Sequence, residues 1–281
     1  MGKFIIVGVD VTPESQIALR WAVEAARQRG SAVRVVRAYL QEQGSWSGLG
    51  VEGYIPTPAP VDIYQAELDA AISFAQDRLG YERGSGWLAN LAPADAILAE
   101  AADADMVVVG TRSRNKMSAA VLGSVATSVS AQAPCPVVVV RGERRTGPVV
   151  VGTDGSEDSD EALAFAFEQA SASDQPLTVV YSWHPQERHG ESAESTSELL
   201  KNWLAETLAP YQAKHPAVRV KTSVLEGRAS AKLVDLSNDA SLVVVGSRGR
   251  GGVAGLLLGS VSQSLLHHAD SPVAVVRRRQ S

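Results

Sequence analysis

The stretch "SLVVVGSRGRGGVAGLLLGSVSQSLLHHADSPVAVVR" (residues 241–277) repeats an earlier part of the chain almost position for position. Its counterpart, "DMVVVGTRSRNKMSAAVLGSVATSVSAQAPCPVVVVR" (105–141), lies 136 residues earlier and aligns without a gap. Each copy reads as a valine-rich strand, a glycine-bearing loop, a helix and a second valine-rich strand. A shorter pair, "FIIVGVDVTPES" (4–15) and "PVVVGTDGSEDS" (148–159), opens the two copies. The sequence therefore predicts a tandem duplication.

The length of the chain suits two domains. At 281 residues it lies where a single hydrophobic core stops growing. The boundary falls in the charged, Gly- and Pro-bearing stretch around 142–147. We expect a first domain over residues 1–142 and a second over 147–281.

Within each copy, short apolar runs alternate with longer segments of helical period. The second copy gives five predicted strands: Pro148–Thr153, Leu177–Ser182, Val218–Leu225, Leu242–Gly246 and Pro272–Arg277. It also gives four predicted helices: Glu157–Ala172, Ala193–Lys214, Ala229–Asn238 and Ser260–His268. Strands that are apolar on both faces and joined by helices form a parallel sheet covered on both sides. The predicted fold is α/β, with two tandem doubly wound, Rossmann-like domains, each a five-stranded parallel sheet with helices on both faces.

Composition and charge exclude several classes of partner. With 45% hydrophobic residues, 20% charged residues and a net charge of −5, the chain is typical of soluble globular proteins and has no global field that attracts nucleic acid or an anionic membrane. No apolar run reaches membrane-spanning length, and the N-terminal run is broken by Asp10. The single cysteine, Cys135, excludes an intrachain disulfide and fits a reducing cytoplasm. We expect Cys135 to be a buried structural residue.

The loop from Gly246 to Ser260 follows a predicted strand and precedes a predicted helix, at the edge of an open sheet where ligands bind. Ser260 and Gln263 have the spacing of a capping box, which predicts Ser260 as the N-cap. A helix N-terminus attracts anions, and we expect Gly246 and Gly249 to adopt positive φ and turn their amides inward. The glycines alone leave a second interpretation open, a flexible turn without a ligand.

The spacing of Gly246, Gly249, Gly259 and Ser260 resembles the G-x2-G-x9-G-S/T signature of the universal stress protein family. ATP-binding members of that family hold the phosphates with this loop. The resemblance covers nearly the whole chain and includes the strand-end segments "GVD" and "GTDGS" and the closing strands "PVVVVR" and "PVAVVR". It implies a fold of the adenine nucleotide alpha hydrolase type and ATP, with or without Mg²⁺, as the ligand.

The resemblance also implies roles for residues of the second copy. Thr153 and Asp154 end the first strand beside the ribose, and Ser182 ends the second strand near the adenine. Seven residues are implied around the phosphates: Gly246, Ser247, Arg248 as a counter-charge, Gly249, Gly259, Ser260 and Val261. Asp154 has a competing local role, since a short acidic side chain after a strand organises the turn that follows.

The first copy keeps part of this pattern. Four of its residues correspond to the implied site: Asp10, Gly110, Gly123 and Ser124. Ser113 stands where the second copy has Gly249, and Leu91 stands where it has Gly227. A non-glycine residue is disfavoured where positive φ is needed, so we expect weaker binding at the first site or none. Three basic residues could compensate or form a solvated loop: Arg112, Arg114 and Lys116. The Gly/Pro-rich insertion 41–60 is open to two interpretations, a surface loop or a lid.

The sequence offers no catalytic set. It lacks the GK[ST] and G-x-S-x-G motifs, the loops carry no acid, and the five histidines lack metal-ligand spacing. We therefore predict no catalytic residue and no metal site, and a regulatory ATP-binding module of stress or dormancy responses, as the resemblance implies. Two alternatives stay open: a slow ATPase or nucleotide hydrolase, and a structural interaction protein with inactive sites.

The closing strands indicate how the copies assemble. Both are short and apolar, and unpaired strand edges invite a partner. In the family these strands pair between subunits, so we expect them to pair here inside one chain as a pseudo-dimer, with a homodimer of chains as a further expectation.

Overall fold

The computed structural model describes residues 4–40, 61–111, 122–143, 146–183, 193–251 and 257–278. The first half contains β1 (Phe4–Val9), α1 (Pro13–Arg29), β2 (Ala32–Tyr39), α2 (Val61–Leu79), β3 (Gly84–Asn90), α3 (Pro93–Glu100), β4 (Met106–Gly110), α4 (Ser124–Gln132) and β5 (Val137–Val140). The second half contains β6 (Val149–Gly152), α5 (Glu157–Ser173), β7 (Leu177–Trp183), α6 (Ala193–Lys214), β8 (Val220–Glu226), α7 (Ala229–Ser237), β9 (Leu242–Gly246), α8 (Ser260–His268) and β10 (Val273–Val276). The insertion 41–60 lies outside the described residues.

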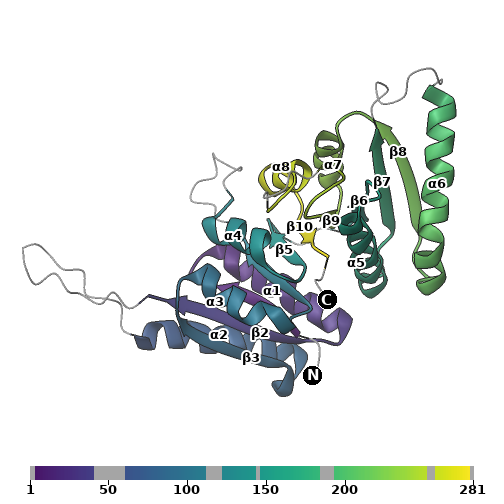
Figure 1. The fold of residues 1–281 in the computed structure, drawn as a ribbon. Coiled ribbons are helices and arrows are strands. Elements are labelled where there is room, and N and C mark those ends of the chain that lie inside the picture. Colours follow the sequence, from purple (N-terminus) through teal and green to yellow (C-terminus); the bar gives the residue numbers. More distant parts are fainter. Residues whose placement is uncertain are drawn as a thin grey trace, which may run out of the picture.

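The strands form one ten-stranded sheet in the order β3-β2-β1-β4-β5-β10-β9-β6-β7-β8 (Figure 1). Within each half all neighbouring strands are parallel. Each half is therefore a five-stranded doubly wound unit, which confirms the predicted fold class.

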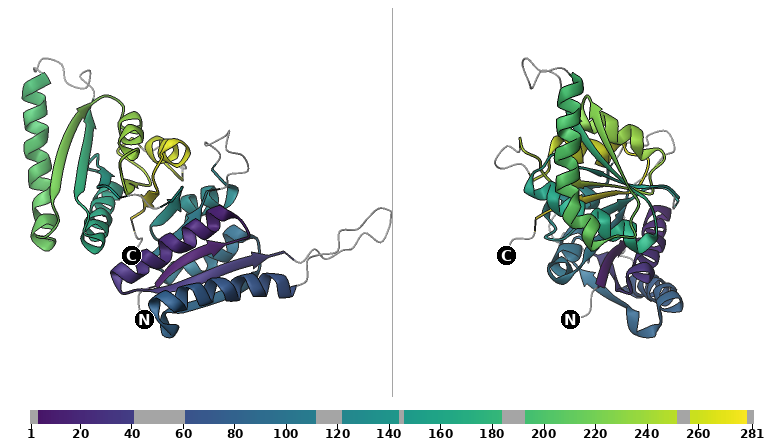
Figure 2. Two further views of the ribbon diagram at one scale, coloured as in Figure 1. Left: turned by 180° about the vertical axis from the view of Figure 1, so that it is seen from behind. Right: turned by 90° about the vertical axis from the view of Figure 1, so that its right-hand side faces the viewer.

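The halves join through the antiparallel pair β5 and β10, called the seam below. Val138 lies opposite Ala274, and these two residues occupy the same place in the repeat. Val139 pairs with Val273, and Val137 pairs with Val275. The seam is thus centred on a local twofold axis that relates one half to the other, and Figure 2 shows the halves on either side of it. Pairing between two separate chains stays a prediction.

Both faces of the sheet are covered, which explains why the central strands β4, β5, β6, β9 and β10 are almost continuous runs of valine. Helices α1, α2, α5 and α6 bury one core, and helices α3, α4, α7 and α8 bury the other. Along β5, Val138 and Val140 belong to the first core, whereas Val137 and Val139 belong to the second.

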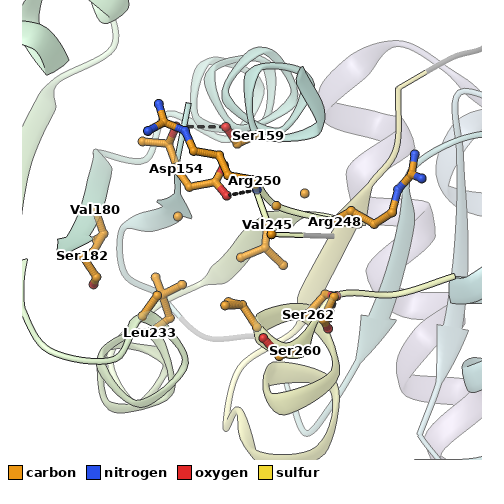
Figure 3. Close-up of a pocket in the computed structure, with 18 of the residues that line it drawn as sticks. Asp154, Ser159, Val180, Ser182, Leu233, Val245, Arg248, Arg250, Ser260 and Ser262 are labelled. Atoms are coloured by element: carbon orange, nitrogen blue, oxygen red, sulfur yellow. Dashed lines mark hydrogen bonds between the residues drawn. The ribbon is translucent and has the colours of Figure 1, made fainter. Parts of the chain in front are cut away.

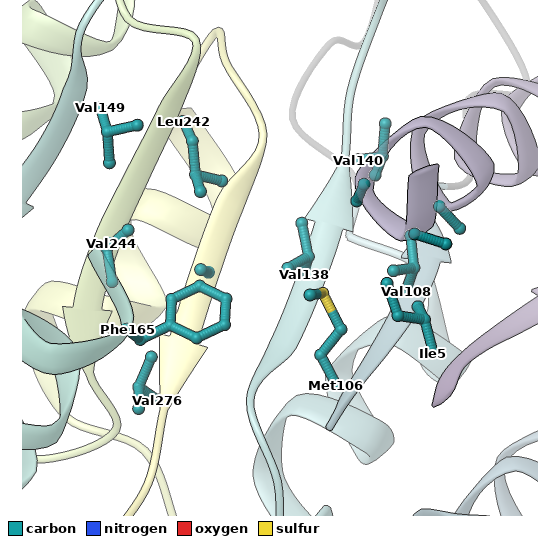
Figure 4. Close-up of a cluster of buried hydrophobic side chains, with 14 of the residues drawn as sticks. Ile5, Met106, Val108, Val138, Val140, Val149, Phe165, Leu242, Val244 and Val276 are labelled. Atoms are coloured by element: carbon teal, nitrogen blue, oxygen red, sulfur yellow. The ribbon is translucent and has the colours of Figure 1, made fainter. Parts of the chain in front are cut away.

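The first core crosses the seam (Figure 4). Val138 of β5 and Val276 of β10 belong to it, together with Phe165 of α5. The hydrophobic interior is therefore continuous between the halves. Cys135 is buried in the second core, as expected. None of the helices within the described ranges combines the length and the hydropathy that a membrane span requires.

Candidate functional site

A cavity of about 400 Å³ opens at the carboxyl ends of β6, β7 and β9, between the starts of α5, α7 and α8 (Figure 3). Nine of the ten residues predicted for the second site line it: Thr153, Asp154, Ser182, Gly246, Arg248, Gly249, Gly259, Ser260 and Val261. The tenth, Ser247, does not. We call this cavity the second pocket.

Asp154 holds two segments of the second pocket together. Its Oδ1 accepts hydrogen bonds from the amide of Ser156 at 3.0 Å and from the hydroxyl of Ser156 at 2.6 Å. Its Oδ2 accepts a hydrogen bond from the amide of Arg250 at 2.9 Å. Burial raises the pKa of Asp154, but the hydrogen bonds from Ser156 and the Arg250 amide outweigh burial, so the pKa lies below its ordinary value. Asp154 is therefore an ionised side chain in the wall of the cavity, and it also organises the turn.

Gly246 and Gly249 serve close approach and not positive φ, so that part of the prediction is wrong. Gly246 and Gly249 are not among the glycines with positive φ, and Gly259 has φ −79°. A Cβ on Gly246 would lie 2.9 Å from the carbonyl carbon of Asp158, and a Cβ on Gly249 would lie 2.4 Å from Oδ2 of Asp154. A side chain at Gly246 would push the loop away from α5, and a side chain at Gly249 would push it away from Asp154.

The start of α8 also differs from the prediction. Gly259 is the N-cap, it makes no side-chain cap, and Ser260 is the first helical residue. The carboxamide of Gln263 donates to the carbonyl of Leu258 at 3.3 Å and not to Ser260, so the capping box is absent. The first amides of α8 therefore face the second pocket without a capping side chain, an arrangement that suits an anion.

Ser247 and Arg248 have a supporting role that the sequence did not predict. Ser247 is fully buried, and its hydroxyl donates to Oδ2 of Asp158 at 2.6 Å. The backbone amide of Arg248 donates to the same oxygen at 3.1 Å, and the side-chain Nε of Arg248 lies 3.7 Å from that oxygen. Figure 3 shows the guanidinium of Arg248 turned away from the centre of the cavity. Asp158, in the first turn of α5, thus fixes the beginning of the loop.

The opposite wall of the second pocket is apolar and ends at a polar group. Leu233 of α7, Val180 of β7 and Val245 of β9 line it. Beside them the hydroxyl of Ser182 is buried and has no hydrogen-bond partner in the described part of the chain. An apolar slot with one unsatisfied hydroxyl suits a flat heteroaromatic ring that carries hydrogen-bonding groups.

Arg250 is a cation of the second pocket that sequence reasoning missed. It lines the cavity, and a Cβ added at Gly155 would come within 2.4 Å of its Nη2. Gly155 has φ +74°, so the turn after β6 brings bare backbone beneath this guanidinium. The sequence signal for this role was the position of Arg250 in the loop, directly after Gly249.

The first half has a corresponding cavity of about 270 Å³, which we call the first pocket. The four predicted residues line it: Asp10, Gly110, Gly123 and Ser124. Burial raises the pKa of Asp10, but hydrogen bonds from Thr12 and Ser15 and the charge of Arg37 outweigh burial and lower it. The predicted residues Arg112, Ser113, Arg114 and Lys116 lie outside the described residues.

The first pocket lacks polar groups of the second. Val9 stands in place of Thr153, and Ala38 stands in place of Ser182, since each pair has the same register in its half. A buried arginine, Arg37, forms part of the wall and is held by Glu67 at 2.7 Å. The first pocket therefore offers no hydroxyl at the place where the second offers an unsatisfied one.

The family model described as "Universal stress protein family" matches residues 1–141 and again residues 146–277. The chain belongs to the universal stress protein family. Universal stress protein Rv2623 of Mycobacterium tuberculosis is 33% identical to it over 290 residues, covering 97% of this chain and 96% of that protein. Universal stress protein Mb2028c of Mycobacterium bovis is 33% identical over 291 residues, covering 98% and 97% of the two chains.

Two solved structures share the architecture of this universal stress protein over its full length. A universal stress protein from Archaeoglobus fulgidus superposes with a TM-score of 0.67 at 17% identity, covering 99% of this chain and 97% of that chain. The functionally unknown protein PA1789 from Pseudomonas aeruginosa superposes with a TM-score of 0.69 at 19% identity, covering 99% and 93%. At these identities the likeness shows the fold alone.

The described residues of this universal stress protein contain no cluster of three histidine, cysteine or acidic side chains that could hold a metal ion.

Proposed function

We propose that this universal stress protein binds ATP in the second pocket and acts as a nucleotide-responsive regulator. One observation carries the proposal. A single cavity combines an apolar slot that ends at the unsatisfied hydroxyl of Ser182 with a helix N-terminus that has no capping side chain. The first feature suits the adenine ring and the second suits the phosphates.

The residues between these two ends suit the sugar and the charge. Asp154 is ionised. Its Oδ1 already accepts two hydrogen bonds from Ser156, but its Oδ2 accepts one from the Arg250 amide and has a second lone pair that can accept a ribose hydroxyl. Gly249 and Gly259 leave bare backbone beside the phosphates, and Arg250 supplies positive charge. Mg²⁺ would arrive with the nucleotide, bound by phosphate oxygens and water.

A regulator needs only different affinities of its states for the ligand, because ligand binding then shifts the populations of those states. The second candidate is a slow ATPase. It is favoured by one feature, the ionised carboxylate of Asp154 in the cavity wall, which could orient a water molecule.

Identification of the nucleotide that copurifies with the protein tests the proposed ligand. We expect ATP in the extract, and a rise in melting temperature when ATP is added to stripped protein. An extract without nucleotide and an unchanged melting temperature would favour a structural interaction protein instead. A single-turnover experiment with bound ATP separates the two functions. Intact ATP after hours supports the regulator, whereas ADP formation that is abolished in an Asp154→Ala protein saturated with ATP supports the ATPase.

The two pockets should bind ATP unequally. We expect calorimetry to give one tight site per chain, with the first pocket at least about tenfold weaker, because it lacks the hydroxyls of Thr153 and Ser182. Ser182→Ala should weaken the tight site and leave the melting temperature of the ligand-free protein close to that of the wild type. Two equal sites per chain would contradict the asymmetry.

A further inference from the structure

Two arginines occupy matching places at the seam. Arg141 follows β5 and Arg277 follows β10, 136 residues later. Nη1 of Arg141 donates to the carbonyl of His267 at 3.4 Å, and Nη2 of Arg277 donates to the carbonyl of Ala131 at 2.5 Å. His267 and Ala131 are themselves related by the repeat, and each lies in the last turn of a helix, α8 or α4. Each half therefore supplies a cation to the C-terminus of a helix of the other half, where the helix dipole favours positive charge.

Arg277 also makes a contact within its own half. Nη2 of Arg277 also donates to the carbonyl of Leu257 at 3.1 Å. Nε of both arginines and Nη2 of Arg141 are buried and have no hydrogen-bond partner in the described ranges. Arg277 thus joins the loop of the second half to a helix of the first half.

Leu257 is next to the residues that form one side of the second pocket. Leu258, Gly259 and Ser260 follow it, and all three line the cavity. From the other direction the amide of Gly259 donates to the carbonyl of Ser247 at 2.7 Å. The start of α8 is therefore held at two points, by Ser247, the residue that follows β9 in its own half, and by α4 of the other half through Arg277.

We infer that Arg277 is a positioning residue for the second pocket, anchored on the first half of the chain. One consequence rests on the proposed function: the ATP affinity of the second pocket depends on the contact between Arg277 and α4. It also means that binding is reciprocal, because a ligand that holds the start of α8 stabilises the contact between the halves by the same factor. The first half would then serve the second pocket whether or not the first pocket binds a nucleotide.

Arg277→Gln tests the inference, with Arg141→Gln as its matched control in the full chain. Both changes remove one charged bond across the seam, and Arg277→Gln also removes the bond to Leu257, so the ligand-free melting temperature should fall in both variants and further in Arg277→Gln. We expect ATP affinity to fall about tenfold in Arg277→Gln, the worth of one charge-assisted hydrogen bond, and to change less than about twofold in Arg141→Gln. Equal ATP affinities in the two variants would overturn the inference.

Amide hydrogen exchange of the ligand-free proteins gives a readout that does not need ATP. We expect faster exchange from Leu258 to Ser262 in Arg277→Gln and unchanged exchange there in Arg141→Gln. If the wild type bound no ATP, the proposed function would fail, and the exchange rates alone would decide the positioning role. Identical exchange in both variants would overturn it.

Discussion

Replacing Gly249 by alanine should lower the ATP affinity of the second pocket by about tenfold or more, a loss of at least ~1.4 kcal/mol. A Cβ at this position would lie 2.4 Å from Oδ2 of Asp154. The carboxylate cannot move aside freely, because the amide and hydroxyl of Ser156 hold its other oxygen. The loop must therefore move, which breaks the bond from the Arg250 amide to Asp154 and withdraws backbone from the phosphates.

Gly251→Ala is the matched control for this prediction. Gly251 also lines the second pocket, but a Cβ on it would meet no atom within 4 Å. Isothermal calorimetry on the two variants and the wild type measures the difference, and circular dichroism checks that both fold. Wild-type affinity in Gly249→Ala would show that the close approach of Gly249 to Asp154 is irrelevant to the ligand.

Val139→Asp should destroy the compact tandem arrangement. Val139 is fully buried at the seam and pairs with Val273. An ionised carboxylate there would lack a partner, and burying such a group costs several kcal/mol. That cost is a large fraction of the about 5–15 kcal/mol by which a domain is stable. We expect separated halves or aggregates, observed by size-exclusion chromatography with light scattering, and a much lower melting temperature.

Ile63→Asp is the control for the charge itself. Ile63 is 49% exposed and lies in the first turn of α2, where the helix dipole favours an acidic residue. This variant should keep the wild-type elution volume and melting temperature. A soluble, compact Val139→Asp chain that melts with the wild type would contradict the role of the seam.

Much of the fold could be predicted because its signals are local. The strand Leu242–Gly246 and the helix Ser260–His268 have the predicted bounds, since a valine run, a glycine loop and a helical period mark them directly. The N-cap could not be predicted this way. The Ser-x-x-Gln pattern does not show whether the helix begins at the serine or one residue before it. The hydrogen bond from the Gly259 amide to the carbonyl of Ser247, which fixes Gly259 as the N-cap, joins residues that no local pattern relates.

The supporting contacts of the site were out of reach for a different reason. Asp158 binds Ser247 across 89 positions of the chain, and Arg277 reaches Ala131 across 146. No local pattern marks such pairs. The glycines were recognised as necessary, but sequence reasoning assigned the wrong cause, because close packing and positive φ both select glycine.

The antiparallel pairing of β5 with β10 inside one chain has a consequence for dilution. In a dimer of separate subunits, such a contact forms in a bimolecular step and weakens as the protein becomes scarce. Here the covalent connection fixes the effective concentration of one half near the other. The contact therefore forms in a unimolecular equilibrium that does not depend on the protein concentration. The central pair of strands should therefore stay closed at the lowest cellular copy number as firmly as at the highest.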